Sequence, residues 1–322
     1  MAKRRKKVKS SSKYLSYIIW ILSFIVVISA SLAVGYHFGY NDTKTHTSLE
    51  QKNKEKAAAI IENKSVNDRL KEVLKQTSQK NISANHEYDE SSLAKPPMRI
   101  KKDFTQSSTK PKLAIILDDV SVRSQVAAIK KLNLPLTMSF LPPSKNRPNS
   151  AKLASKEDFY MVHLPMEANN FTKEEPFTLR ITDSKSEIRD MVKKIKKLFP
   201  RVSYINNHTG SKFTSNEKAV NRLITVLNKN HINFIDSRTT AQTKVPKVMK
   251  SFGLKYISRD VFLDHQSDKK YIKNQIKKAI EVSKEYGSAI AIGHPHKNTL
   301  LAIDESKALF ADVELVFINK LY

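Results

Sequence analysis

In residues 111–322, short apolar runs alternate with amphipathic stretches. The amphipathic stretches predict helices at Val122–Leu132, Lys185–Phe199, Glu217–Asn228, Lys269–Tyr286 and Glu305–Leu309. The apolar runs are typical of buried strands, and they lie at Leu113–Leu117, Leu136–Leu141, Phe159–Leu164, Ser203–Ile205, Asn233–Ile235, Val261–Leu263, Ala289–Ile292 and Leu315–Ile318. This alternation favours a parallel α/β fold. Seven or eight strands in this length fit a distorted barrel with outer helices better than an open sheet.

The first apolar run, Lys112–Val120, ends in two adjacent carboxylates, Asp118 and Asp119. Acidic side chains are almost never buried unless they are paired or bound to a cation. Ligands bind at the carboxyl ends of strands in α/β folds. The two residues therefore mark a candidate site, and the alternative is that one of them only caps the following helix. Because successive strand residues point to opposite sides, we expect Asp118 and Asp119 to have different roles.

Polar residues also follow most of the later strands. Parallel strands bring their carboxyl ends to one edge, so we expect these residues to lie on the same rim as Asp118 and Asp119. They are His163, Glu167, Asn206, Asn207, His208, Asp236, Arg238, Arg259, Asp260, Asp264 and His294. The structural alternatives are a turn at Asn206 and Asn207, a cap at Asp236 and a surface pair at Asp264 and His265.

This set of residue types suits metal-assisted hydrolysis. The chain has no cysteine, so any metal must be held by His, Asp or Glu. One carboxylate and two neutral imidazoles, with water in the fourth position, form the usual open catalytic zinc site. A neighbouring carboxylate can then act as a base and a histidine such as His294 as the acid that protonates a leaving amine. The chain has no phosphate-binding loop, nucleophile elbow or dinucleotide fingerprint.

Six segments together resemble the divergent polysaccharide deacetylase family of YibQ-like envelope proteins, relatives of the NodB-type carbohydrate esterases. These segments are Ile116–Asp119, His163–Glu167, Asn206–Ser211, Asp236–Thr240, Arg259–Asp264 and Gly293–Pro295. The resemblance covers roughly residues 110–322. It implies a distorted (β/α) barrel of the polysaccharide deacetylase type. It also implies metal-dependent removal of N- or O-acetyl groups from a glycan.

The resemblance also implies roles for individual residues. Asp118 matches the catalytic base and Asp119 a metal ligand, while His294 matches the general acid. His163 resembles the first histidine of the family's H-x-x-x-H metal motif, whose second histidine is replaced here by Glu167. His208 is the expected third ligand, with Glu167 as the alternative.

Either Arg238 or Arg259 is expected to orient the base, and Arg238 is our first choice. Asn207, Asp236, Asp260 and Asp264 complete the set of candidate site residues. The expected cofactor is a divalent metal, in the first instance zinc.

The N-terminal region has a different character. Residues 14–40 contain no Lys, Arg, Asp or Glu and predict a transmembrane anchor, with a cleaved signal peptide as the alternative. The basic residues 1–13 predict a cytoplasmic tail, which puts the C-terminal domain on the periplasmic or other extracytoplasmic side of the inner membrane. The polar residues 41–110 predict a flexible linker, with a short helix or a weak coiled coil as the two interpretations of 57–75. Residues 111–322 form the predicted barrel domain.

We therefore expect a metal-dependent deacetylase acting on an acetylated polysaccharide or peptidoglycan in the cell envelope. The alternative is a catalytically inactive deacetylase-like scaffold or glycan-binding module, which the missing motif histidine favours. The net charge of +26 suits an anionic envelope polymer. Nucleic acid is not the expected partner, because the lysines are spread over nearly every helix and no nucleic-acid motif is present. The sequence leaves the substrate, the metal and the oligomeric state open.

Overall fold

The computed structural model describes residues 17, 20, 22–32, 35–36, 110–169 and 174–321. Residues 22–32 are helical and exposed. Among the described residues, no helix is both long enough and apolar enough to cross a bilayer. The predicted anchor at 14–40 falls only partly within the described residues. The basic tail, the linker up to residue 109 and its short helix lie outside them.

Eight strands form one sheet, and every strand pair within it is parallel. The strands are β1 (Lys112–Val120), β2 (Thr137–Phe140), β3 (Met161–Met166), β4 (Tyr204–Thr209), β5 (Asn233–Ile235), β6 (Val261–Phe262), β7 (Ser288–Gly293) and β8 (Glu314–Leu315). Each overlaps a strand predicted from the apolar runs.

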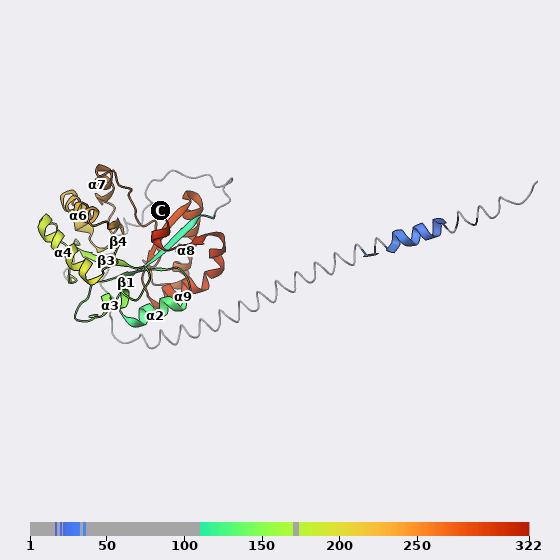
Figure 1. Ribbon diagram of the computed structural model, residues 1–322, viewed down its shortest axis with the longest axis horizontal. Helices are drawn as coiled ribbons and strands as arrows, with labels where there is room; N and C mark the ends of the chain where they lie inside the picture. Colours follow the sequence, from blue (N-terminus) through green and yellow to red (C-terminus); the bar gives the residue numbers. More distant parts are fainter. Residues whose placement is uncertain are drawn as a thin grey trace, which may run out of the picture. The chain divides into compact units, whose positions relative to one another are not determined.

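The strand order is β5-β4-β3-β2-β1-β7-β6, and β8 pairs with the start of β1. Between the two ends of the sheet, a single isolated parallel bridge joins Asp236, just after β5, to Ser258, just before β6. The fold is therefore a parallel (β/α) half-barrel with helices around it (Figure 1). The expectation of a distorted barrel is confirmed in this coarser form.

Helices connect the strands and lie around the sheet (Figure 1). They are α2 (Arg123–Lys131), α3 (Ser150–Ala154), α4 (Lys185–Leu198), α5 (Ser211–Ser215), α6 (Glu217–Lys229), α7 (Val245–Ser251), α8 (Lys269–Tyr286) and α9 (Lys297–Glu305), with 3-10 turns at Lys307–Asp312 and Ile318–Lys320. Three of the long helices begin at side-chain caps: Ser184 with Glu187 for α4, Asn216 for α6 and Asp268 for α8.

The predicted helix at Glu305–Leu309 is wrong. Glu305 is the last residue of α9, and a 3-10 turn begins at Lys307. Helix α9 itself was not predicted, because residues 299–304 are all buried and it has no polar face along that stretch. A helix buried on all sides lacks the amphipathic period that a sequence pattern detects.

Two apolar clusters pack on opposite faces of the sheet. The larger one lies between strands and helices and includes Leu113, Ile115 and Leu117 of β1. The smaller one includes Ala114 and Ile116 from β1, together with residues of β3, β5 and β7, so it fills the inside of the half-barrel. Because strand residues alternate, the next inward position on β1 is Asp118. The apolar interior therefore ends at a carboxylate on the carboxyl-end rim.

Candidate metal and acid–base centre

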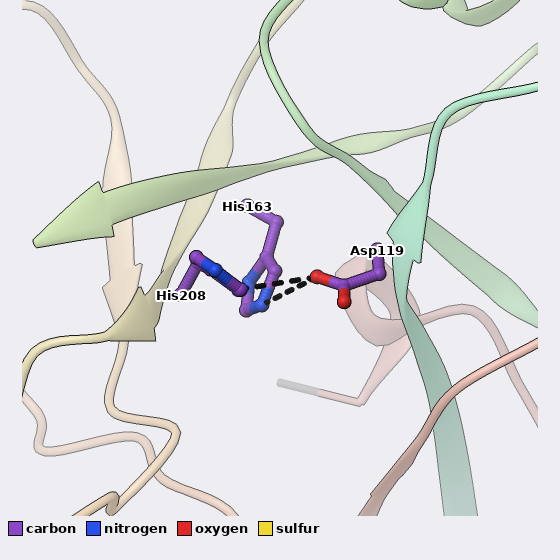
Figure 2. Close-up of side chains that lie close together, drawn as sticks. All are labelled: Asp119, His163 and His208. Carbon is purple, nitrogen blue, oxygen red and sulfur yellow. Dashed lines mark ion pairs between the residues drawn. The ribbon is translucent and has the colours of Figure 1, made fainter. Parts of the chain in front are cut away.

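Asp119, His163 and His208 converge at the carboxyl-end rim from strands β1, β3 and β4 (Figure 2). Asp119 Oδ1 lies 3.5 Å from His163 Nε2 and 3.1 Å from His208 Nδ1. One ligand atom from each residue lies within 4.8 Å of the other two, and all three side chains are buried. The two imidazole rings meet edge to face, with centroids 5.0 Å apart. These are the three predicted ligands.

The backbone of Asp119 explains how both carboxylates reach this site. Asp119 has φ 59°, a left-handed conformation, and the register between β1 and β2 shifts between Leu117 and Val120. The alternation of side chains therefore ends at Asp118. His163 Nε2 lies 3.5 Å from both Asp118 Oδ2 and Asp119 Oδ1. The expectation that the two carboxylates point to opposite sides is wrong, because a left-handed residue breaks the extended strand.

The imidazole of His163 is suited to metal binding because its neutral form is favoured. Burial lowers the pKa of His163 well below its ordinary value, and the neighbouring imidazole of His208 lowers it further. The Asp119 carboxylate opposes these effects without reversing them. A neutral imidazole nitrogen has the lone pair that a metal ligand needs.

The spacing of the three ligand atoms fits a small divalent cation. For tetrahedral zinc with bonds of about 2.1 Å, ligand atoms lie roughly 3.4 Å apart. The two measured separations from Asp119 Oδ1, 3.1 Å and 3.5 Å, bracket that value. One carboxylate and two imidazoles are also the ligand types expected of a catalytic zinc site that keeps one position open. Asp119, His163 and His208 therefore fit the divalent metal that the sequence predicts.

Asp118 is held next to this trio by Asn206, which the candidate site residues did not include. Asn206 Nδ2 donates to Asp118 Oδ1 and Oδ2, both at 2.9 Å, and to Ser237 Oγ at 3.0 Å. Its own Oδ1 accepts a 2.6 Å bond from Ser139 Oγ. A signal for Asn206 was present in the sequence. Residues two apart on a strand share a face, so Asn206 shares one with His208.

His294 and Asp264 form a second unit at the rim. Asp264 Oδ1 lies 3.0 Å from His294 Nδ1, while Asp264 Oδ2 accepts bonds from the His294 backbone N–H and from Thr299 Oγ1, both at 2.7 Å. Burial pushes the pKa of Asp264 up, but the His294 imidazole and these hydrogen bonds outweigh it, so the pKa is lowered. His296 stacks near His294, with ring centroids 5.5 Å apart. Asp264 is therefore no surface residue.

One of the two candidate arginines, Arg259, is electrostatically coupled to Asp118. Arg259 is 4% exposed and donates to the carbonyls of Ser237 at 2.8 Å and Arg238 at 2.9 Å. Burial lowers the pKa of Arg259 to about 10, and the charge of Arg238 adds to this, while the carboxylates of Asp236 and Asp118 oppose it. Arg238 has φ 53° and makes a 3.5 Å bond from Nη1 to the Arg259 carbonyl.

Asn207 and Asp236 form hydrogen bonds that hold the segments after β4 and β5 in place beside the trio. Asn207 donates to the Thr209 carbonyl at 2.7 Å and accepts from the Ser237 backbone N–H at 2.8 Å, so it ties the end of β4 to the end of β5. Asp236 accepts from the Arg238 backbone N–H, Thr243 Oγ1 and the Tyr256 hydroxyl. Burial raises the pKa of Asp236 despite these bonds. These contacts match the alternative interpretation, in which Asp236 is a cap.

Asp260 and Glu167 also make structural contacts. Asp260 Oδ2 accepts from the Ile290 backbone N–H at 2.8 Å, which joins the segment before β6 to β7. Glu167 accepts from Lys212 Nζ at 2.6 Å and from the Ile181 backbone N–H at 2.9 Å. Burial raises the pKa of Glu167, but these two bonds outweigh it and the pKa is lowered. Glu167 is not in the trio, and His208 completes it.

The fold and the site define a parallel (β/α) half-barrel protein with its polar centre at the carboxyl ends of its strands. Residues 115–322 match the family described as divergent polysaccharide deacetylase. This match covers more than half of the chain, so the protein belongs to that family. The resemblance inferred from the six segments is confirmed.

The chain is also similar in sequence to two relatives and in fold to one solved structure. The chain is 31% identical over 224 residues to an uncharacterized protein of Haemophilus influenzae, covering 68% of this chain and 78% of that one. It is 33% identical over 199 residues to the uncharacterized protein YibQ of Escherichia coli, covering 60% and 61%. The crystal structure of the uncharacterized protein ATU2773 of Agrobacterium tumefaciens shares the fold, with a TM-score of 0.57 at 18% identity, covering 67% of this chain and 91% of that one.

Proposed function

We propose that the protein is a metal-dependent deacetylase that hydrolyses acetyl groups on a polysaccharide or peptidoglycan of the cell envelope. The observation that carries the proposal is the convergence of Asp119, His163 and His208 on one point, with Asp118 3.5 Å from His163. Family membership supports the same reaction class. The site offers a metal position, a base and an acid on one rim.

Asp119, His163 and His208 would hold the metal, with zinc as the first choice for this ligand set. When bound, the metal supplies Lewis acidity, which polarises the acetyl carbonyl and makes water a better nucleophile. The left-handed backbone at Asp119 contributes by turning this carboxylate toward the two histidines while Asp118 stays on the inner face.

Asp118 is the proposed base that takes the proton from the attacking water. Both of its oxygens accept hydrogen bonds from Asn206 Nδ2, which fixes the plane of the carboxylate. Asn206 is itself fixed by Ser139 and Ser237, so the base is held by residues of β2, β4 and the segment after β5. A base held in this way loses little freedom when the substrate arrives.

His294 is the proposed acid that protonates the leaving amine or alcohol. Its Nδ1 lies against Asp264 Oδ1, which leaves Nε2 as the nitrogen that exchanges a proton with the substrate. Asp264 is held by the His294 backbone N–H and by Thr299, so it orients the imidazole rigidly. An imidazole oriented by a buried carboxylate is a recurrent arrangement for proton transfer.

We also propose that the protein lies in the inner membrane, with residues 14–40 as its anchor and the deacetylase domain outside the cytoplasm. The support is the sequence pattern alone: an uncharged apolar segment preceded by a basic tail. In that location the positive net charge favours an anionic envelope polymer as the partner.

The test combines metal analysis with acetate release from acetylated glycans, using the purified full chain. We expect about one divalent metal per chain and acetate release, both lost in the Asp119→Ala and His163→Ala variants. Metal without acetate release from any glycan would favour the inactive glycan-binding module instead. Absence of metal after reloading with zinc would overturn the assignment of the trio.

A further inference from the structure

A basic pocket lies next to the site on the same rim. It has a volume of about 300 Å³ and is lined by residues 121–123 after β1, residues 146–149 after β2, and Lys152, Leu153 and Lys156 in and after α3. Four of these residues are basic, namely Arg123, Arg147, Lys152 and Lys156, and none is acidic. Helices α2 and α3 lie close together in Figure 1, and the pocket has lining residues from both.

Arg147 is a buried part of this pocket, not a surface cation. It is 6% exposed, and its Nη2 pairs with Glu175 from the loop after β3. Its Nε makes no hydrogen bond to any residue in the part of the chain that the structure describes. Buried guanidinium N–H groups normally have acceptors. The Nε atom itself is enclosed, so Arg147 contributes to the pocket through its positive charge, and Arg is the residue best suited to carboxylates and phosphates.

The pocket is close to the proposed catalytic centre. Ser121 lines the pocket and follows Asp119 by two residues, so their Cα atoms are at most about 7 Å apart. The loops after β1 and β2 leave the sheet at the same edge as the ends of β3 and β4, because all these strands are parallel. A glycan with an acetyl group at the trio therefore has neighbouring substituents within reach of the pocket.

We propose that this pocket is a subsite for an anionic substituent, a carboxylate or a phosphate, on the glycan from which the acetyl group is removed. The inference rests on the proposed deacetylase function and deepens it, since it names an acidic glycan as the substrate class. Glu175 already neutralises Arg147 in part, so Arg123, Lys152 and Lys156 supply the remaining positive charge. Charge complementarity then selects acidic over neutral glycans.

The general basicity of the chain is the competing explanation, and a charge-matched control separates the two. Lys152 and Lys156 are exposed residues of the pocket, so replacing them leaves the core intact. Lys194 and Lys197 are exposed residues of α4 and do not line the pocket. The double variants Lys152→Ala/Lys156→Ala and Lys194→Ala/Lys197→Ala remove the same charge from different places.

The measurement is glycan binding by the full chain, using calorimetry at fixed salt. The acidic probe is a tetrasaccharide of alternating N-acetylglucosamine and N-acetylmuramic acid. Its methyl ester is the matched neutral probe, and a phosphorylated N-acetylglucosamine tetramer tests phosphate as the anion. We expect wild type to bind an acidic probe about tenfold more tightly than the neutral one, a difference of about 1.4 kcal/mol. The Lys152→Ala/Lys156→Ala variant should lose most of that preference, and the α4 variant should keep it.

Each outcome has a definite meaning. Equal binding of acidic and neutral probes by wild type, or the same loss of preference in both double variants, would overturn the subsite. Stronger binding of the phosphorylated probe than of the carboxylated one would support the subsite with phosphate as its anion. A preference for acidic probes that depends on the pocket, without acetate release, would support the subsite. It would contradict only the proposed catalysis. Acetate release without any preference for acidic glycans would support catalysis and count against the subsite.

Discussion

Asp264 contacts His294 twice, through Oδ1 at 3.0 Å from the ring Nδ1 and through Oδ2 at 2.7 Å from the backbone N–H of the same residue. The carboxylate therefore fixes both the position of the histidine and the orientation of its ring. This arrangement selects the tautomer with a proton on Nδ1, as a proton-transferring histidine oriented by a carboxylate requires.

Asp264→Asn should therefore reduce kcat by roughly 10²–10⁴-fold, because an amide can present its NH₂ group to Nδ1 and favour the other tautomer. KM should change little, since no substrate contact is removed. Steady-state kinetics with an acetylated glycan tests this, with thermal unfolding as a check on folding. A kcat within threefold of wild type would remove Asp264, and with it the His294 dyad, from the mechanism.

Metal removal should destabilise the folded domain. A metal that binds only the folded state stabilises it by about 2.7 kcal/mol at a free concentration 100 times Kd. For a domain of this size, that corresponds to a Tm decrease of about 5–10 °C on chelation. Differential scanning calorimetry with chelator and then with added zinc measures this effect. His163→Ala and His208→Ala should abolish the response.

A matched histidine variant controls for the metal experiment. His231 is exposed in the turn between α6 and β5, away from the trio, and has φ 57°. Asn tolerates this left-handed conformation, so His231→Asn should fold and keep the full zinc response. A response lost equally in His231→Asn would show that the zinc effect does not come from the trio.

Substitutions of the adjacent residues Asp118 and Asp119 should have different effects on metal content and activity. Asp118→Asn should keep the metal and lose roughly 10²–10⁴-fold in kcat, as expected for removal of a general base. Asp119→Asn should lose both metal and activity, while Asn accepts the φ of 59° at this position. Metal content and acetate release are measured on the same samples. Loss of metal in both variants would make Asp118 a ligand instead of a base.

Much of the fold and the site was predictable from the sequence, because the pattern had a simple physical origin. Strands buried on both faces appear as continuous apolar runs, and Lys112–Val120 is one that ends in two carboxylates. The parallel arrangement then brought His163 and His208 together, although 45 residues separate them. The apolar strands and the polar residues that follow them were therefore enough to predict both the fold and the site.

The features that sequence patterns missed depend on backbone geometry or on long-range pairing. Nothing in the residue types shows that Asp119 adopts φ 59°, which sets both carboxylates beside His163. Asn206 was expected on the rim but was given no role, whereas it lies within β4 and holds Asp118. The pairing of Asp264 with His294 depends on neighbouring strand ends, which a linear pattern cannot specify.

Asp236 should make stability fall with increasing pH in the acidic range. Burial raises its pKa above the unfolded value of about 3.9, so the folded state binds more protons than the unfolded state between the two values. The free energy of unfolding therefore decreases as pH rises from about 3.9 through the raised pKa. In Asp236→Asn this contribution is absent. Urea unfolding at several pH values should give a smaller downward slope, and an unchanged slope would contradict the burial effect.

The last prediction separates the two arginines. Arg259 Nε and Nη2 hold the carbonyls of Ser237 and Arg238, and Ser237 Oγ accepts from Asn206, which binds Asp118. Arg238 Nη1 donates a 3.5 Å bond to the Arg259 carbonyl. Charge-assisted hydrogen bonds are worth about 1.5–3 kcal/mol each, so Arg259→Gln should lower the free energy of unfolding by about 3 kcal/mol.

Arg238→Gln should cost less than Arg259→Gln, because the 3.5 Å bond from Arg238 to the Arg259 carbonyl is longer than the 2.8 Å and 2.9 Å bonds that Arg259 donates. Arg259→Gln should also reduce kcat, since the segment that carries Ser237 positions the Asn206–Asp118 pair, and Arg259→Lys should recover part of both losses. Urea unfolding and acetate-release kinetics on the three variants measure these effects. A larger kcat loss in Arg238→Gln than in Arg259→Gln would instead make Arg238 the arginine that orients the base, because the charge coupling of Arg259 to Asp118 would then have no kinetic consequence.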